Sequence, residues 1–261
     1  MRSHSIPSAR SQSSLIKAAP SGLGRLLERS SLNRPLRTQV FAGLWLMLLA
    51  GVLAMTVWAS VADHFPGDVA VGHWIQSNLA GRELSQFLRN VGSAPAAMVT
   101  IALAMGLLIA QRRCRVARLL IVLMVSLVLA ALLKELVDRP RTSVLFLEQH
   151  GTFDAPSFPS GHTFASAIAG AVVLYVAARS QGPRWLRVPL AIWGLGLWLL
   201  QPWASVSAGV HWPSDVLGSL LWSAVVLAPV FFIAERWALP LDRVRPLSRL
   251  AILPLPIRLP V

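Results

Sequence analysis

The sequence predicts an all-α protein, a polytopic membrane bundle of six transmembrane helices with both termini in the cytoplasm. Of the 261 residues, 55% are hydrophobic and only 13% are charged, and the mean hydropathy is +0.60. A soluble domain carries about 25% charged residues, so the composition indicates an integral membrane protein. A helix needs about 20 apolar residues to cross a bilayer core. Apolar segments of about that length occupy residues 39–61, 93–111, 116–137, 163–178, 188–206 and 216–234.

The distribution of basic residues predicts the orientation of the bundle. Most of the 24 Lys and Arg residues lie in the two terminal tails and in the turns 112–118 and 179–187, whereas the other connections carry most of the acids. Cytoplasmic loops of membrane proteins are enriched in Lys and Arg, so we expect the other connections to lie on the outer face. The formal charge of +13 would also suit nucleic-acid binding. The topological bias explains the arginines better, and no nucleic-acid partner is expected.

Three parts are expected along the chain. Residues 1–38 are rich in Arg and Ser, and we expect a disordered cytoplasmic tail near anionic lipid headgroups. Residues 39–237 form the membrane domain, whose first span is long enough for an uncleaved anchor. Residues 238–261 form a second cytoplasmic tail. Cys114 is the only cysteine, so no disulfide forms within one chain.

The outer connection 62–92 contains apolar residues at roughly helical spacing, among them Trp74, Leu84 and Phe87. This pattern predicts an amphipathic helix. Two placements fit the pattern about equally, one along the outer leaflet of the membrane and one packed on the bundle. In either place the helix would help to form an entrance for a lipid.

The stretch Ser-Phe-Pro-Ser-Gly-His, residues 157–162, precedes an apolar segment. Pro ends the preceding run, Gly permits close backbone approach, and the free N–H groups of the helix that begins here attract an anion. His162 is placed to pass a proton to or from that anion. Taken alone, the stretch is more often a plain helix cap with a histidine at the membrane interface.

Four further polar residues lie at the ends of apolar segments. His211 and Asp215 are one helical turn apart if a helix begins near Pro213, and a carboxylate on one imidazole nitrogen leaves the other as a nucleophile. Lys134 places a charge where charges are expensive and usually functional, although snorkelling to the interface is the alternative. Arg141 follows two turns later, where a guanidinium can bind phosphate oxygens. Together with the preceding histidine, these residues predict chemistry on an anionic group, most simply a phosphate.

The order Lys134-x6-Arg141, Pro-Ser-Gly-His and His211-x3-Asp215 resembles the three motifs of the type 2 phosphatidic-acid phosphatase superfamily. These are membrane enzymes related to bacterial acid phosphatases and vanadium haloperoxidases. The resemblance covers about residues 90–235 in motif order, spacing and six-span layout. It implies a metal-independent lipid-phosphate phosphatase without a cofactor, and no cluster with metal-ligand spacing is present in the sequence.

The resemblance also implies a role for each motif residue. His211 would attack phosphorus and form a phosphohistidine, and Asp215 would orient its imidazole. His162 would protonate the leaving oxygen and later activate water. The phosphate oxygens would be held by Lys134, Arg141, Ser160 and the backbone N–H of Gly161.

Two positions depart from the family pattern. Thr142 follows Arg141 where a proline is normal, although Pro140 precedes it. Ser205 stands where the third motif has an arginine, and no arginine lies between residues 188 and 235 to replace it. Loss of one charged ligand would weaken transition-state stabilisation. The arginines that remain as possible substitutes are Arg82, Arg89 and Arg139.

The expected partners are the bilayer and a phosphorylated amphiphile. Undecaprenyl pyrophosphate, phosphatidic acid, phosphatidylglycerol phosphate and a lipid A phosphate all fit an outer-face site near the lipid boundary. We expect a bacterial inner (plasma) membrane location with the site facing the periplasm or exterior. Three alternatives remain: a lipid phosphotransferase, a catalytically weakened relative that keeps the pocket, and an unrelated transporter. The sequence does not define the oligomeric state.

Overall fold

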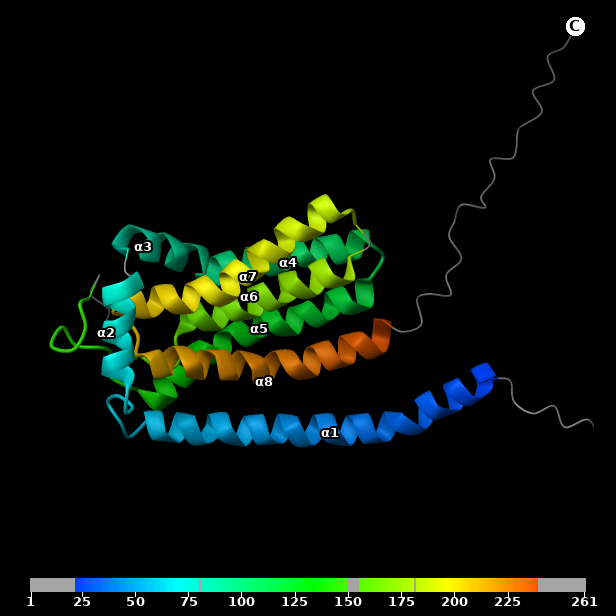
Figure 1. The fold of residues 1–261 in the computed structure, drawn as a ribbon, viewed down its shortest axis with the longest axis horizontal. Helices are drawn as coiled ribbons and strands as arrows, with labels where there is room; N and C mark the ends of the chain where they lie inside the picture. Colours follow the sequence, from blue (N-terminus) through cyan, green and yellow to red (C-terminus); the bar gives the residue numbers. More distant parts are fainter. Residues whose placement is uncertain (1–21, 80, 150–154, 181, 239–261) are drawn as a thin grey trace, which may run out of the picture. The chain divides into compact units, whose positions relative to one another are not determined.

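The structure, a computed structural model, describes residues 22–79, 81–149, 155–180 and 182–238 (Figure 1). The regular elements in these ranges are all α-helices. They are α1 (Gly22–Ala59), α2 (Asp68–Leu79), α3 (Arg82–Val91), α4 (Ala94–Ala110), α5 (Cys114–Val137), α6 (Gly161–Arg179), α7 (Arg184–Ser207) and α8 (Pro213–Ala238). The predicted all-α class is confirmed.

Four helices in the described part of the chain are long and apolar enough to cross a membrane by themselves. They include Leu36–Ala59, Cys114–Val137, Gly161–Arg179 and Pro213–Arg236. A fifth candidate is the pair α3 and α4, which together pass the same test but are bent by 50° at their junction. The protein is therefore a membrane helical bundle with four to five candidate spans.

The two other predicted spans correspond to helices that do not meet the length and hydropathy expected of a single span. Residues 93–111 form α4, which is 17 residues long and therefore short for a span on its own. Residues 188–206 fall within α7, which is long enough at 24 residues. Pro189, Gln201 and Pro202 interrupt the apolar character of α7. Length and composition of these helices thus do not establish the predicted total of six.

The chain comprises two compact units, residues 1–44 and residues 45–261, and the boundary falls inside α1. The helix begins at Gly22, well inside the stretch predicted as a tail, whereas residues 1–21 lie outside the described residues. The predicted second tail beyond Ala238 also lies outside them.

Within the second unit, the end of α1 is tied to α8 by two tryptophans. The indole Nε1 of Trp45 donates to the carbonyl oxygen of Val225 at 2.9 Å. The indole Nε1 of Trp222 donates to Oγ1 of Thr56 at 3.0 Å. Buried indoles need an acceptor, so these bonds fix where the two helices meet.

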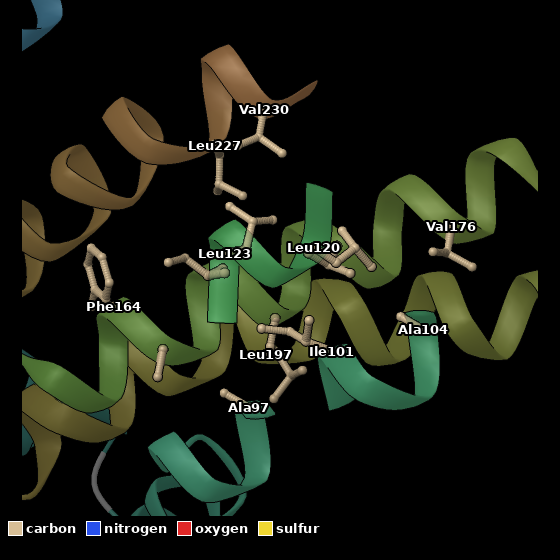
Figure 2. Close-up of a cluster of buried hydrophobic side chains, with 14 of the residues drawn as sticks. Ala97, Ile101, Ala104, Leu120, Leu123, Phe164, Val176, Leu197, Leu227 and Val230 are labelled. Atoms are coloured by element: carbon tan, nitrogen blue, oxygen red, sulfur yellow. The ribbon is translucent and has the colours of Figure 1, made fainter. Parts of the chain in front are cut away.

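The main hydrophobic core lies among α4, α5, α6, α7 and α8 (Figure 2). Small and branched side chains interleave there, and apolar burial together with close packing holds the bundle. The residues labelled in Figure 2 are Ala97, Ile101, Ala104, Leu120, Leu123, Phe164, Val176, Leu197, Leu227 and Val230.

The connection 62–92 forms two short helices rather than one, with a break between α2 and α3. Both lie at the same end of the bundle (Figure 1). Ser85 of α3 is fully buried, whereas Leu84 and Phe87 are 52% and 62% exposed. One side of α3, marked by Ser85, is therefore packed on the protein, while Leu84 and Phe87 point outward. Of the two predicted placements, packing on the bundle is observed for α3, through the bond between Ser85 and Ser207.

Candidate functional site

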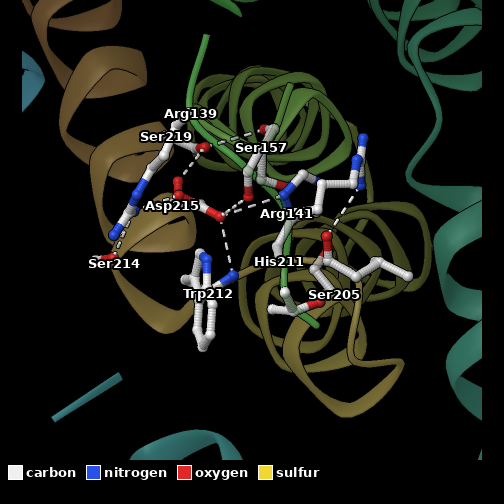
Figure 3. Close-up of polar contacts among 12 residues, drawn as sticks. Arg139, Arg141, Ser157, Ser205, His211, Trp212, Ser214, Asp215 and Ser219 are labelled. Carbon is white, nitrogen blue, oxygen red and sulfur yellow. Dashed lines mark hydrogen bonds and ion pairs between the residues drawn. The ribbon is translucent and has the colours of Figure 1, made fainter. Parts of the chain in front are cut away.

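Three chain segments meet at the end of the bundle where α2 and α3 lie (Figures 1 and 3): the two ends of the connection between α5 and α6, and the turn between α7 and α8. Backbone hydrogen bonds join them. The N–H of Ser157 donates to the carbonyl of Arg139 at 2.8 Å, and the N–H of Ser160 donates to the carbonyl of Asp215 at 3.3 Å. The motif residues lie on these connections or on the adjoining helix ends.

His211 lies in the turn before α8, and its Nδ1 atom faces Oδ2 of Asp215 at 3.6 Å. Both side chains are buried, and the distance is slightly longer than a normal hydrogen bond. Burial lowers the pKa of His211 to about 3; its interaction with Asp215 opposes the shift, and the charges of Lys134 and Arg141 add to it. The imidazole is therefore neutral near pH 7. Because Nδ1 faces the carboxylate, Nε2 is directed away from it.

Three donors hold the carboxylate of Asp215 in place. The backbone N–H of Trp212 donates to Oδ2 at 2.9 Å, and the hydroxyl of Ser157 donates to the same oxygen. Nη1 of Arg139 donates to Oδ1 at 2.6 Å. A buried carboxylate is unfavourable unless charged partners and hydrogen bonds compensate it. These donors do so, and they fix the carboxylate against the imidazole.

Arg139 is a second fully buried charge. Its Nη2 atom lies 3.3 Å from Oδ2 of Asp68, its Nη1 donates to the hydroxyl of Ser214 at 2.8 Å, and its Nε donates to the carbonyl of Ala62 at 3.1 Å. The ring of Phe65 lies 4.7 Å from the guanidinium carbon. Each of the three guanidinium nitrogens thus has a protein partner. Arg139 therefore belongs to the hydrogen-bond network that holds Asp215 against His211.

Asp68, the first residue of α2, completes this network. Its Oδ1 accepts from the N–H of Ser214 at 2.8 Å, and its Oδ2 accepts from the hydroxyl of Ser214 at 2.6 Å and from the N–H of Phe65 at 2.7 Å. Asp68, Arg139 and Asp215 therefore form a buried row of alternating charge that ends at His211.

Lys134, in the last turn of α5, lies against the Pro-Ser-Gly-His turn. Its Nζ donates to the carbonyl of Pro156 at 2.5 Å and to that of Ser157 at 3.3 Å. Its Cε lies 3.7 Å from the position that a Cβ on Gly161 would occupy. The ammonium is therefore inside the protein beside the start of α6, as a snorkelling lysine would not be.

Arg141 bonds both the segment before α6 and the turn between α7 and α8. Its Nε donates to the carbonyl of Ala155 at 2.5 Å, and its Nη1 donates to the carbonyl of Val210, next to His211, at 2.9 Å. Burial lowers the pKa of Arg141, and the negative charge of Asp215 opposes that shift. The side chain is thus placed beside the histidine and is partly withdrawn from water.

The Pro-Ser-Gly-His turn forms the N-terminus of α6, which begins at Gly161. The hydroxyl of the buried Ser160 accepts from the N–H of Thr163 at 3.5 Å, so this side chain caps the helix. His162 is partly exposed, and the positive charges of Arg89, Lys134 and Arg141 all act on it. The turn is therefore a helix cap whose histidine faces a group of cations.

Ser205 occupies a closed polar environment on α7. Its side chain is fully buried, and its hydroxyl donates to Oε1 of Gln201 at 3.1 Å. The hydroxyl of Thr163 donates to Ser205 at 3.5 Å. A neutral hydroxyl thus stands where the family pattern has a guanidinium.

Sequence reasoning did not identify Asp68, Ser157 and Ser214 as residues of this region. Ser157 had a weak signal, since it lies two residues before Pro159 in the quoted stretch. The other two had none, because their contacts depend on a tertiary fold that brings α2 to the start of α8. No group of three or more His, Cys, Asp or Glu residues able to hold a metal ion occurs among the described residues.

Comparison with known proteins agrees with the fold and the motif order. The model of the PAP2 superfamily matches residues 115–238, a range that contains all seven predicted site residues. Residues 115–238 therefore show the PAP2 superfamily, and this range carries the three motifs.

One solved structure has a similar fold. It is the crystal structure described as the first transmembrane PAP2 type phosphatidylglycerolphosphate phosphatase from Bacillus subtilis. The two chains are 18% identical with a TM-score of 0.57, and the match covers 75% of this chain and 98% of the other. A search of curated proteins finds no significant match.

Proposed function

We propose that the protein is a membrane lipid-phosphate phosphatase that hydrolyses its substrate through a phosphohistidine. The observation that carries this proposal is the neutral imidazole of His211, with Nδ1 directed at the buried carboxylate of Asp215. In this arrangement Nδ1 keeps the proton and Nε2 is a nucleophile with a free lone pair. Membership of the PAP2 superfamily supports the same assignment.

The reaction proceeds in two steps. Nε2 of His211 attacks phosphorus and forms an N–P bond, while the P–O bond to the lipid breaks and His162 gives its proton to the leaving oxygen. Neutral His162 then takes a proton from water, whose oxygen attacks phosphorus and breaks the N–P bond. Asp215 stabilises the positive charge that develops on the attacking imidazole.

The cations beside the histidines serve as ligands for the phosphate oxygens. Lys134 bonds the segment just before α6, and Arg141 bonds the same segment and the turn before His211. The backbone N–H of Gly161 and the dipole of α6 also favour an anion there. Ser160 contributes as the cap that fixes this turn. As negative charge moves to the oxygens, these fixed positive groups stabilise it.

We propose a six-span topology with both termini in the cytoplasm, in which this site would lie on the outer face. The basic turns 112–118 and 179–187 join α4 to α5 and α6 to α7. The site segments adjoin the opposite ends of α5, α6 and α7, so the basic turns and the site would lie on opposite faces of the membrane, which supports this orientation. The substrate would be an amphiphile with its phosphate at the outer leaflet, in a bacterial inner membrane. Phosphatidylglycerol phosphate is one candidate, because the similar solved structure is described as acting on it.

Purified protein in detergent, assayed for release of phosphate from a panel of lipid phosphates with chelator present, tests the proposal. We expect release that persists with chelator and is lost in His211→Ala, while the exposed His73→Ala variant keeps it. Transfer of phosphate to an added lipid or sugar without release would indicate a phosphotransferase. Absence of both from every substrate would contradict catalysis.

A further inference from the structure

The phosphate site has fewer cations on α7 than the family pattern requires. Ser205 is fully buried and bonded to Gln201, so α7 offers a neutral hydroxyl at the position of the missing arginine. Residues 188–235 contain no arginine at all. A replacement must therefore come from an element outside this part of the sequence.

Helix α3 is packed against the second half of α7 in a fixed register. The hydroxyl of Ser85 donates to the hydroxyl of Ser207 at 3.0 Å. A Cβ added at Gly92 would lie 2.2 Å from Cγ of Gln201, so the backbone of Gly92 lies directly against that side chain. The two contacts pair the start of α3 with the end of α7, so the helices run in opposite directions.

This register places Arg89 at the level of Ser205. Arg89 lies four residues after Ser85 and three before Gly92, so all three share one face of α3. On α7, Ser205 lies between the two partners of that face, Gln201 and Ser207.

The amphipathic character of α3 supports the same direction for Arg89. Leu84 and Phe87 are exposed on the opposite side of the helix, whereas Arg89 is partly buried and its Nε atom is fully buried. Ser85 and Arg89 are thus withdrawn from the surroundings, whereas the polar side chains of Arg82, Glu83 and Gln86 on the same helix are exposed. The side of α3 that carries Ser85 and Arg89 therefore faces the interior of the bundle.

Electrostatic contacts link Arg89 to the catalytic end of the bundle. Its positive charge acts on both His162 and Arg141. Lys134 and Arg141 act on the same histidine. Like charges brought together in a partly buried site repel each other more strongly than in water. Three cations converging on one histidine therefore favour binding of an anion among them.

We propose that Arg89 of α3 binds the substrate phosphate in place of the arginine that the third motif lacks at residue 205. The inference rests on the proposed function for the nature of the anion. The guanidinium would reach the phosphate oxygens from α3 instead of α7, on the side of the site where Ser205 lies. Its role is to hold charge that increases in the transition state.

Arg89→Gln tests the assignment, with Arg82→Gln as the matched control on the same helix. Arg82 is exposed, so its substitution changes the net charge equally and leaves the site intact. We expect kcat/KM for a cleaved lipid phosphate to fall about 10²–10³-fold in Arg89→Gln and to stay within about twofold in Arg82→Gln. Equal rates in the two variants would overturn the proposal.

Restoration of the family residue gives a second test. In the Arg89→Gln background, Ser205→Arg returns a guanidinium from the α7 side, and we expect a gain of about tenfold or more in kcat/KM. A merely structural role for Arg89 predicts no such gain, because the contacts of α3 would stay broken. Arg89→Lys should keep part of the wild-type kcat/KM, since the ammonium keeps the positive charge but cannot bind two phosphate oxygens at once as the planar guanidinium does.

Binding of inorganic phosphate separates this inference from the proposed function. The midpoint of thermal unfolding in detergent is measured against phosphate concentration for wild type, Arg89→Gln and Arg82→Gln. We expect saturable stabilisation in wild type and Arg82→Gln, and about tenfold weaker phosphate binding in Arg89→Gln. This result would hold even if no lipid were hydrolysed. Equal phosphate affinity in all three proteins would contradict the inference and leave the phosphatase assignment standing.

Discussion

Nη1 of Arg139 lies 2.6 Å from Oδ1 of Asp215, and neither side chain is exposed. Arg141, only two residues later, has a different task, since it bonds the carbonyls of Ala155 and Val210 beside the anion site. Pro140 separates the two arginines and fixes the backbone between them. One arginine therefore orders the carboxylate behind the histidine, and the other lies on the side of the histidine where we propose that phosphate binds.

Removal of Arg139 should destabilise the protein strongly. Arg139→Met leaves the carboxylates of Asp68 and Asp215 buried without their cation, and loss of one partner of a buried pair lowers the free energy of unfolding by about 3–5 kcal/mol. Arg179→Met breaks the exposed ion pair with Glu235, whose contribution is about 1 kcal/mol or less. Denaturant unfolding in detergent measures both. Equal losses would contradict the buried row.

Asp68→Asn should lower activity although Asp68 is remote from the motifs in sequence. The variant keeps the shape of the side chain but removes the charge that holds Arg139, and thereby loosens Asp215 and His211. We expect a fall in kcat of about tenfold or more with little change in KM, because the effect is on the nucleophile. Asp63→Asn on the same connection is exposed and serves as the control. A change in KM alone would argue against this indirect effect.

Acid should destabilise the folded protein partly through His211. Its pKa is lowered from 6.5 to about 3 in the folded state. Between these two values the unfolded chain binds a proton that the folded chain does not, so stability falls as the pH is lowered through this window. The midpoint of thermal unfolding, measured from pH 7 to pH 4, should fall less steeply in His211→Asn than in wild type.

The exposed His73→Asn variant is the control for that comparison. An identical slope in wild type and His211→Asn would contradict a buried neutral imidazole. The same shift predicts that His211 does not set the acid limb of the pH–rate profile above about pH 4.

Gly209 should tolerate no side chain. Its φ is +66°, and a Cβ would lie 1.9 Å from the backbone oxygen of Glu148. Gly209→Ala adds left-handed strain and a backbone clash, so we expect a loss of about 3 kcal/mol or more in the free energy of unfolding. Gly106→Ala, inside α4 with nothing within 4 Å, should be neutral or stabilising by up to about 1 kcal/mol. Similar effects at both positions would contradict the tight turn before His211.

The sequence alone predicted the all-α class and most of the residues that the structure brings together at the candidate site. The site residues could be predicted because they stand at the ends of apolar segments and in a recognisable motif order, both of which are visible in the local sequence. They are Lys134, Arg141, His162, His211 and Asp215. The break between α2 and α3 was not predicted, because an amphipathic pattern reports periodicity and not where a helix stops.

The partners of Asp215 could not be predicted for a different reason. The role of Arg139 follows from burial between Asp68 and Asp215, and no local rule pairs residues so far apart. The inward direction of Arg89 likewise depends on how Gly92 packs on Gln201. The motifs in the sequence identify the groups that we propose to contact substrate, whereas the residues that hold Asp215 depend on tertiary contacts.

The bond between Asp68 and Arg139 also sets a boundary for protein engineering. The superfamily match begins at residue 115, yet the carboxylate that compensates Arg139 comes from α2. A chimaera that transplants only residues 115–238 into a relative would carry a buried arginine without its own counter-ion. The exchangeable module therefore starts before Asp68, and natural changes at residues 68 and 139 should be inherited together.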